Sequence, residues 1–222
     1  MSIFIVNEHS FTMNLMSPRH RTTADTDILT AAMRVIGRLG PARMTLADVA
    51  KEIGLAPATL MQRFGSKRGL LLAVSSHDTA GVSRCFAAAR TAHKSPLDAL
   101  LAAMSEVCQF VETPEQMSNS LAFLQIDLND PEFHRLALEN VHKVKSEIRL
   151  LLGAAVGTGE LAPCDTDRLA RAIQAVHSGS MVNWAIYREG TVAGWVRGNL
   201  EMLLKPLRTR PRPHARSRKS AK

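Results

Sequence analysis

The sequence has few aromatic residues and contains no long apolar run. Phe, Trp and Tyr make up 5% of the 222 residues, whereas alanine, leucine and methionine are abundant. Side chains without a branch at Cβ lose little rotamer freedom in a helix, which favours a helical protein. No stretch approaches the ~18 uninterrupted apolar residues of a membrane helix, and the first residues lack the charged start and apolar core of a secretory signal. We therefore expect a helical protein without a membrane partner.

Cysteine is also scarce, and motifs of enzymes and metal sites are missing. Cys85, Cys108 and Cys164 are odd in number, scattered and not at metal-ligand spacing, which indicates reduced thiols and a cytoplasmic protein. The sequence has no Gly-rich phosphate loop, nucleophile elbow or HExxH motif. Gly157-Thr158-Gly159 follows a predicted helix and indicates its end. We predict no catalytic residue, no metal site and no cofactor, and hence no enzyme.

The net charge of +8 is distributed unevenly along the chain. Counting Lys and Arg against Asp and Glu, residues 1–76 hold 9 and 5, residues 77–204 hold 11 and 15, and residues 205–222 hold 8 and 0. A basic start, an acidic middle and a basic end are expected if only the ends meet polyanions such as DNA. The alternative for the last segment is a solvated, disordered tail, and the sequence leaves both open.

Helix start and stop signals divide most of the chain into about nine helices. Apolar residues recur at helical spacing over 28–39, and Gly40-Pro41 ends that segment. Thr45 and Asp48 then predict a capping-box-like start, and Gly54 ends the short helix that follows. The next signals are Pro57 and Phe64, at the two ends of a third helix, and Ser66, the cap of a longer fourth one.

Three later helices are predicted to begin with a cap residue followed by proline, whose missing N–H would be unpaired in the first turn anyway. These pairs are Ser95-Pro96, Thr113-Pro114 (with a capping box to Gln116) and Asp130-Pro131. Two more helices follow, one from Asp165 or Thr166 to near Gly190 and one from Thr191 to before Pro206. No convincing strand and no repeat of 20–50 residues is found. The fold class is therefore predicted to be all-α.

The segment 45–67 carries the functional signal. Its sequence, TLADVAKEIGLAPATLMQRFGSK, predicts a short amphipathic helix, a glycine turn and a second short helix, which is the helix-turn-helix pattern. The second helix keeps Leu60 and Phe64 on one face and presents Gln62 and Arg63 on another. An exposed polar face on a short, otherwise buried helix fits the major groove of DNA.

From Ile28 to about Val74 the sequence resembles the N-terminal domain of the tetracycline-repressor (TetR) family of bacterial transcriptional regulators. The matching residues are Ile28-Leu29, Ala31-Ala32, Gly40, residues 45–50, Gly54-Leu55, Thr59-Leu60, Phe64, Ser66-Lys67 and Leu70-Leu71. The resemblance implies a helix-turn-helix domain followed by a helical ligand-binding and dimerisation domain. It also implies double-stranded operator DNA, a second copy of the chain and a small-molecule effector as partners.

Carried over residue by residue, the resemblance implies DNA contacts from three helices. Thr45 and Ala47 would begin the helix that lies across the groove, and Lys67 would meet a phosphate at the start of the fourth helix. The recognition helix would be lined by Ala56, Pro57, Ala58, Thr59, Met61, Gln62 and Arg63. Gln favours adenine and Arg favours guanine by bidentate geometry, although both also reach phosphates.

Two positions depart from the family pattern. The family usually has a hydroxyl where Ala56 stands, so the helix cap is weaker here. It usually has tyrosine where Met61 stands, so a flexible apolar contact replaces a phosphate hydrogen bond. Before the first helix, Arg19 and Arg21 either enter the minor groove or belong to a solvated tail. The predicted domains are a disordered segment 1–20, a DNA-binding domain 21–76, a ligand-binding and dimerisation domain 77–205 and a basic disordered tail 206–222.

In the family layout, residues 77–205 enclose an effector pocket and pair with a second subunit. The pocket candidates, whose alternative role is plain core, are Met104, Cys108, Phe123, Leu138, His142, His177, Met181 and Trp184. The last two helices are expected to form a four-helix bundle with a second subunit. The residues expected there are Gly179, Ser180, Trp184, Ile186, Trp195, Leu200 and Leu203, with a core role in one subunit as the alternative.

Three functions are compared. The first is a dimeric repressor released by a small apolar or amphipathic molecule. The second is a ligand-independent architectural protein that coats DNA with its basic start and tail. The third is a helical ligand-binding or catalytic protein whose DNA-binding segment is incidental. The large acidic middle favours the first over the second, because coating DNA does not require it.

Overall fold

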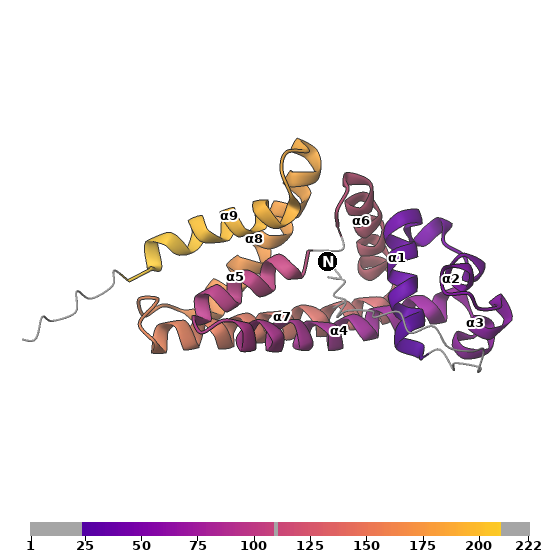
Figure 1. The fold of residues 1–222 in the computed structure, drawn as a ribbon, viewed down its shortest axis with the longest axis horizontal. Coiled ribbons are helices and arrows are strands. Elements are labelled where there is room, and N and C mark those ends of the chain that lie inside the picture. Colours follow the sequence, from indigo (N-terminus) through magenta and orange to yellow (C-terminus); the bar gives the residue numbers. More distant parts are fainter. Residues whose placement is uncertain (1–23, 109–110, 210–222) are drawn as a thin grey trace, which may run out of the picture.

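The computed structural model describes residues 24–108 and 111–209, without the side chains of residues 78–80. This part forms nine α-helices and one 3-10 helix (Figure 1). They are α1 (Asp25–Arg43), α2 (Leu46–Glu52), α3 (Pro57–Phe64), α4 (Lys67–Ala92), α5 (Pro96–Glu106), α6 (Pro114–Asn129), α7 (Pro131–Gly157), α8 (Thr166–Tyr187), α9 (Val192–Leu204) and η1 (Lys205–Leu207). An isolated bridge joins Leu161 to Arg208, and these ranges contain no strand. The all-α prediction is confirmed.

Side-chain caps begin most of the helices where the sequence predicts them. Thr45 Oγ1 accepts a hydrogen bond from Asp48 N at 3.2 Å, and Asp48 Oδ2 accepts one from Thr45 N at 2.8 Å. The hydrogen bonds from Thr45 also hold the pKa of Asp48 below its usual value. Ala56 gives α3 no side-chain cap, as expected from the missing hydroxyl. The caps of the later helices are Ser66, Ser95, Thr113, Asp130, Asp165 and Thr191.

One predicted helix end coincides with a break in the structure, and another lies earlier than predicted. The helical conformation of α1 breaks at Gly40, with φ of 79°, and a separate turn that contains Pro41 follows this kink and runs to Arg43. A Cβ on Gly40 would lie 2.6 Å from Asn119 Oδ1 of α6, so both the backbone and this close approach require glycine. The eighth helix stops at Tyr187 and does not continue to near Gly190, because Arg188 adopts a left-handed φ of 58°.

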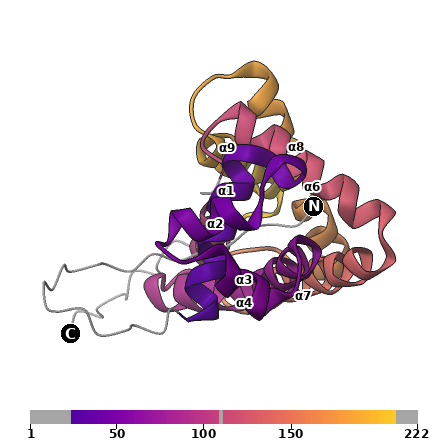
Figure 2. The same cartoon turned by 90° about the vertical axis from the view of Figure 1, so that its right-hand side faces the viewer.

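Two hydrophobic clusters form the core, and α4 contributes to both. Leu70, Leu71 and Val74 pack with α1–α3 in one cluster, whereas Val82 and Phe86 pack with α5–α9 in the other. We call residues 25–76 the head and the remaining helical part the body. The head lies at one end of the molecule, opposite to the end where the described chain stops (Figure 1). Seen from the head, α1, α2 and α3 lie in front (Figure 2).

Contacts from the body hold the head at two places. Asn119 Nδ2 of α6 donates a hydrogen bond to the carbonyl of Gly37 at 2.7 Å. Arg68, at the start of α4, donates to both carboxylate oxygens of Asp130 at 2.8 and 3.0 Å and to Glu132 Oε2 at 2.7 Å. Its guanidinium also lies 5.4 Å from the ring centre of Phe133, a cation–π distance. We call Arg68, Asp130, Glu132 and Phe133 the Arg68 clamp.

Candidate nucleic-acid interface and effector region

The third helix is anchored to the head by one face and open on the other. Leu60 is fully buried, and Phe64 packs half-buried against the same cluster. Gly65 ends the helix with φ of 71°. The exposed residues are Ala56, Pro57, Ala58, Met61, Gln62 and Arg63, and Thr59 is half-buried. A short helix with one buried and one exposed face has the form of a recognition helix.

The second helix supports α3 from the inner side. Val49 and Ala50 are buried, and the Ala50 carbonyl accepts a hydrogen bond from Leu55 N at 2.8 Å, which closes the turn before α3. Thr45 and Ala47 are exposed at the start of α2. All ten residues assigned to DNA by the resemblance therefore lie in one stretch of the head, eight of them exposed, whereas Thr59 and Lys67 are half-buried.

The charged and polar side chains of this stretch have different neighbours. Arg63 Nη1 lies 2.9 Å from Asp25 Oδ1 at the start of α1. Lys67 Nζ donates a hydrogen bond to the carbonyl of Ala42 at 2.6 Å. Gln62 makes no side-chain hydrogen bond to the described part of the chain. Nothing in the spacing of the sequence indicated the Asp25–Arg63 or Lys67–Ala42 contact. Arg19 and Arg21 lie outside the described residues.

Five of the eight candidate effector residues gather in the core of the body. Met104, near the end of α5, and Cys108, just after that helix, are buried in the same cluster as Met181 and Trp184 of α8. His177, one turn before Met181, is fully buried. Burial raises the pKa of the Cys108 thiol to about 12, so this cysteine stays protonated and inert.

Three candidates lie elsewhere, which corrects the prediction. Leu138 and His142 are exposed on α7, because the buried face of this helix is formed by Leu136, Asn140 and Val144. Positions two residues away are turned by about 200° on a helix of 3.6 residues per turn. Phe123 is buried in the head cluster, with its ring edge-on to Phe133 at 6.1 Å. It therefore helps to join α6 to the head.

His177 is the polar group in the centre of the body. Neither ring nitrogen makes a hydrogen bond of normal geometry to a described residue. Burial lowers the pKa of His177 to about 4, and the nearby backbone of Met104 opposes this lowering without overcoming it. The imidazole is therefore neutral at physiological pH and presents a polar but uncharged group to its surroundings.

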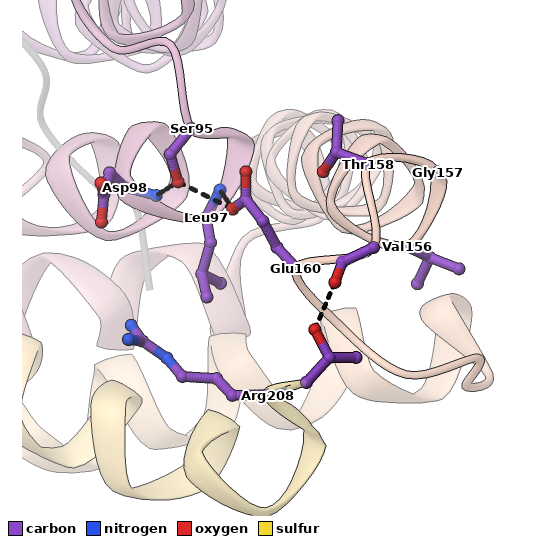
Figure 3. Close-up of a pocket in the computed structure, with 10 residues that line it drawn as sticks. Ser95, Leu97, Asp98, Val156, Gly157, Thr158, Glu160 and Arg208 are labelled. Atoms are coloured by element: carbon purple, nitrogen blue, oxygen red, sulfur yellow. Dashed lines mark hydrogen bonds between the residues drawn. The ribbon is translucent and has the colours of Figure 1, made fainter. Parts of the chain in front are cut away.

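A cavity lies at the end of the body where the described chain stops, and Figure 3 shows the residues that line it. It has a volume of about 950 Å³ and is formed by the start of α5, the end of α7 and the segment Arg208-Thr209. Glu160 Oε2 accepts hydrogen bonds from Ser95 Oγ at 2.7 Å and from Leu97 N at 3.1 Å. Two smaller cavities, of about 460 and 230 Å³, lie beside α6 and between α4 and α5. None of the eight candidate effector residues lines any of these three.

The described ranges contain no candidate metal site and no candidate membrane span. No group of three or more His, Cys, Asp or Glu side chains is placed to hold a metal ion there. None of the helices in those ranges has the length and apolar content needed to span a membrane.

The surfaces of α8 and α9 differ in part from the expectation for a dimer. Ser180, Trp184 and Leu200 are buried within the subunit, and Asn199 Nδ2 donates a hydrogen bond to Ser180 Oγ at 2.9 Å. These residues join α8 to α9 and are core. Ile186 and Met202, in contrast, are 70% and 65% exposed. The small residues Gly179, Gly194 and Gly198 are exposed along the same two helices.

A helix-turn-helix head on a larger helical body is the architecture of a DNA-binding transcriptional regulator. Residues 28–74 match the model "Bacterial regulatory proteins, tetR family", and residues 96–205 match "BetI-type transcriptional repressor, C-terminal". The chain therefore belongs to the TetR family, whose members are regulators and not enzymes. The resemblance inferred from the head is confirmed and extends over the body.

Similar proteins support this assignment. The HTH-type transcriptional regulator BetI of Rhizobium meliloti is 28% identical over 163 residues, covering 72% of this chain and 76% of that protein. A putative regulator from Saccharomonospora viridis, solved with choline, has a TM-score of 0.66 at 19% identity over 83% of this chain and 97% of that one. FadR of Bacillus subtilis, solved with stearoyl-CoA, has a TM-score of 0.63 at 16% identity over 83% and 100%. At these identities the two structures show a shared fold.

Proposed function

We propose that the chain is a homodimeric repressor that binds a palindromic operator through α3 and is released by a small molecule bound in its body. The observation that carries this proposal is the exposed outer face of α3, a helix fixed by the fully buried Leu60. Met61, Gln62 and Arg63 stand on that face. The match to a BetI-type repressor domain supports repression as the direction of control.

The proposed DNA contacts fall into two kinds. Gln62 and Arg63 read base edges in the major groove, where such side chains form bidentate pairs, and Met61 contacts a thymine methyl group. Lys67 and the start of α4 bind a phosphate, because a helix N-terminus and a nearby ammonium both favour an anion. The remaining contacts are Thr45, Ala47, Ala56, Pro57, Ala58 and Thr59, which place the two helices against the groove.

Dimerisation is proposed through the exposed sides of α8 and α9. Ile186 and Met202 are large apolar residues in contact with solvent in the single subunit. Glycine at 179, 194 and 198 permits close approach of a second pair of helices. Helix-turn-helix dimers bind half-sites about 34 Å apart or at multiples of that distance, so a second head is needed for tight operator binding.

The effector site is proposed among Met104, Cys108, His177, Met181 and Trp184. Methionine adapts to irregular apolar ligands, and the neutral His177 can donate one hydrogen bond from one ring nitrogen and accept one at the other. Choline carries methyl groups around its charge and stearoyl-CoA a long acyl chain, so each ligand of the two similar structures presents apolar surface. An apolar or amphipathic effector fits this pattern.

Coupling between effector and DNA is proposed through α4. This helix has 26 residues and crosses from the head cluster to the body cluster. A ligand that shifts its body end alters the tilt of the head and hence the distance between two recognition helices. Since a duplex fixes that distance, a coupling free energy of ~1–3 kcal/mol is enough, and it must be reciprocal.

The test begins with selection of duplexes from a random library by the full-length chain, followed by footprinting on the selected sequence. We expect a discrete palindrome occupied by a dimer. Coating of DNA in proportion to its length would favour an architectural protein, and failure to select any sequence would contradict the proposal. For the effector, choline and an acyl-CoA are titrated calorimetrically with and without operator. A compound that binds equally in both titrations shifts nothing and is not the effector.

A further inference from the structure

A contact within the head links the start of α1 to the end of the recognition helix. Asp25 Oδ1 lies 2.9 Å from Arg63 Nη1, although the two residues are 38 positions apart. The Asp25 carboxylate is 65% exposed and the Arg63 side chain 29% exposed. The ion pair therefore lies at the surface of the head, beside the outer face of α3.

Because of this ion pair, the two side chains proposed to read bases differ in their contacts within the head. Gln62 makes no side-chain hydrogen bond to the described residues, whereas Arg63 is held by a carboxylate. A guanidinium carries five N–H donors in a rigid fork, so the contact of Arg63 Nη1 with Asp25 restricts the orientation of the whole fork. An arginine oriented in this way enters the groove with less conformational freedom to lose.

The stability of the start of α1 does not by itself account for an aspartate at position 25. The first turn of this helix contains both Asp25 and Asp27, and Ala24 provides no side-chain cap. Either carboxylate suits the positive end of the helix dipole. Asp27 makes no ion pair within the part of the chain that the structure describes. A negative charge next to a DNA-binding face weakens attraction to phosphates, so Asp25 lowers general DNA affinity while it orients one arginine.

We infer that Asp25 is a positioning residue that sets sequence specificity through Arg63. It holds the guanidinium in one orientation for a base edge and prevents it from serving as a mobile phosphate contact. Specificity is a difference of affinities, and lowering the affinity for wrong sequences increases it. This inference rests on the proposed function of α3.

The experiment compares full-length wild type, Asp25→Asn and Asp27→Asn in selection from a random duplex library and in binding to one random duplex. Asp27→Asn is the matched control, because it removes the same charge from the same helical turn and leaves Arg63 in place. We expect both variants to bind the random duplex more tightly than wild type does. Only Asp25→Asn loses preference at one base pair of each half-site, by roughly fivefold or more, the value of a bidentate contact.

Asp25→Asn is also introduced into an Arg63→Ala variant, to distinguish an effect through the orientation of Arg63 from an effect of the Asp25 charge itself. We expect Asp25→Asn to leave base preference unchanged in this variant, because the arginine that Asp25 orients has been removed. A change in preference that persists without Arg63, or one that Asp27→Asn reproduces, would overturn the inference. So would a uniform loss of affinity for all DNA together with a lower melting temperature, which would make the pair a purely structural link. A wild-type chain that selects no sequence would overturn the proposed function as well.

Discussion

At the scale of single residues, His177 couples the stability of the body to pH. Its pKa is about 4 in the folded chain because of burial, against about 6.5 in an unfolded chain. The unfolded state therefore binds the proton more readily between these two values. The free energy of unfolding linked to the neutral imidazole is therefore fully present above about pH 6.5 and is lost as pH falls towards 4.

We predict that wild type loses on the order of 3 kcal/mol of unfolding free energy through this group between pH 6.5 and 4. His177→Leu should lack this part of the pH dependence, as measured by urea denaturation at several pH values. His77→Gln is the control variant, because burial also lowers the pKa of the half-buried His77 and the pH dependence that it causes must be separated from that of His177. Equal slopes in wild type and His177→Leu would show that His177 is not the responsible group.

The two kinds of DNA contact give a second prediction at this scale. Gln62→Ala should reduce discrimination at its own base pair by about 1–3 kcal/mol, whereas Lys67→Ala should weaken binding to all sequences and lower the salt slope by about one. Lys67 also donates a hydrogen bond to the Ala42 carbonyl, so the melting temperature is measured beside DNA binding. If Lys67→Ala changes the selected sequence and keeps the salt slope, the two roles are reversed.

At the scale of helices, the Arg68 clamp joins the DNA end of α4 to the start of α7. Asp130 is both the cap of α7 and the bidentate partner of Arg68, and the hydrogen bond from Arg68 is the main cause that holds the pKa of Asp130 below its usual value. Arg68→Ala and Glu132→Gln should each lower the free energy of unfolding only slightly, because both side chains are half exposed to solvent. In a double-mutant cycle their effects should be less than additive. Strict additivity would mean that the two side chains do not interact in solution.

Helix boundaries were predictable where their causes are local. Thr45 with Asp48 is a capping box, and Gly54 adopts a positive φ, so each signal lies within a few residues of its effect. The Arg68 clamp was not predictable, because Arg68 and Asp130 are 62 positions apart and nothing in either neighbourhood indicates the other.

The positions of the candidate effector residues were likewise only partly predictable from the sequence. Leu138 and His142 were assigned to a pocket from the layout of the family, although the spacing of Phe133, Leu136, Asn140 and Val144 defines a different buried face of α7. A closer use of helical periodicity would have excluded them. No periodicity would have excluded Phe123, which is buried but in the head cluster. Which cluster a buried residue joins depends on how helices pack.

At the scale of the whole molecule, the described chain ends far from the DNA face. Arg208 and Thr209 line the cavity at the start of α5, and α4 alone spans about 39 Å between that end and the head, at 1.5 Å per residue. The remaining residues, 210–222, can extend over roughly 45 Å at most. Only a nearly fully extended segment would therefore reach the head of its own subunit.

We therefore predict that a chain ending at Thr209 keeps the operator affinity and salt slope of wild type. The basic residues removed are Arg210, Arg212, Arg216, Arg218, Lys219 and Lys222. The measurement is the dependence of binding on salt concentration for both chains, since each neutralised phosphate contributes about −0.9 to the slope. A slope that becomes less steep by several units would show that the segment does contact the bound DNA.

The second prediction for the whole molecule concerns the proposed dimer. Charges on the exposed apolar residues of α8 and α9, Ile186→Glu with Met202→Glu, should give folded monomers in analytical ultracentrifugation. Operator binding should weaken by orders of magnitude, because one head alone gains only half of the contacts made across two half-sites.

Leu150→Glu is the matched control: Leu150 is 58% exposed on α7, and this variant should stay dimeric with unchanged affinity. Leu200→Glu would not serve, since Leu200 is fully buried and a charge there would unfold the subunit. A monomer at micromolar concentration that still binds the operator tightly would contradict both the interface and the need for two heads.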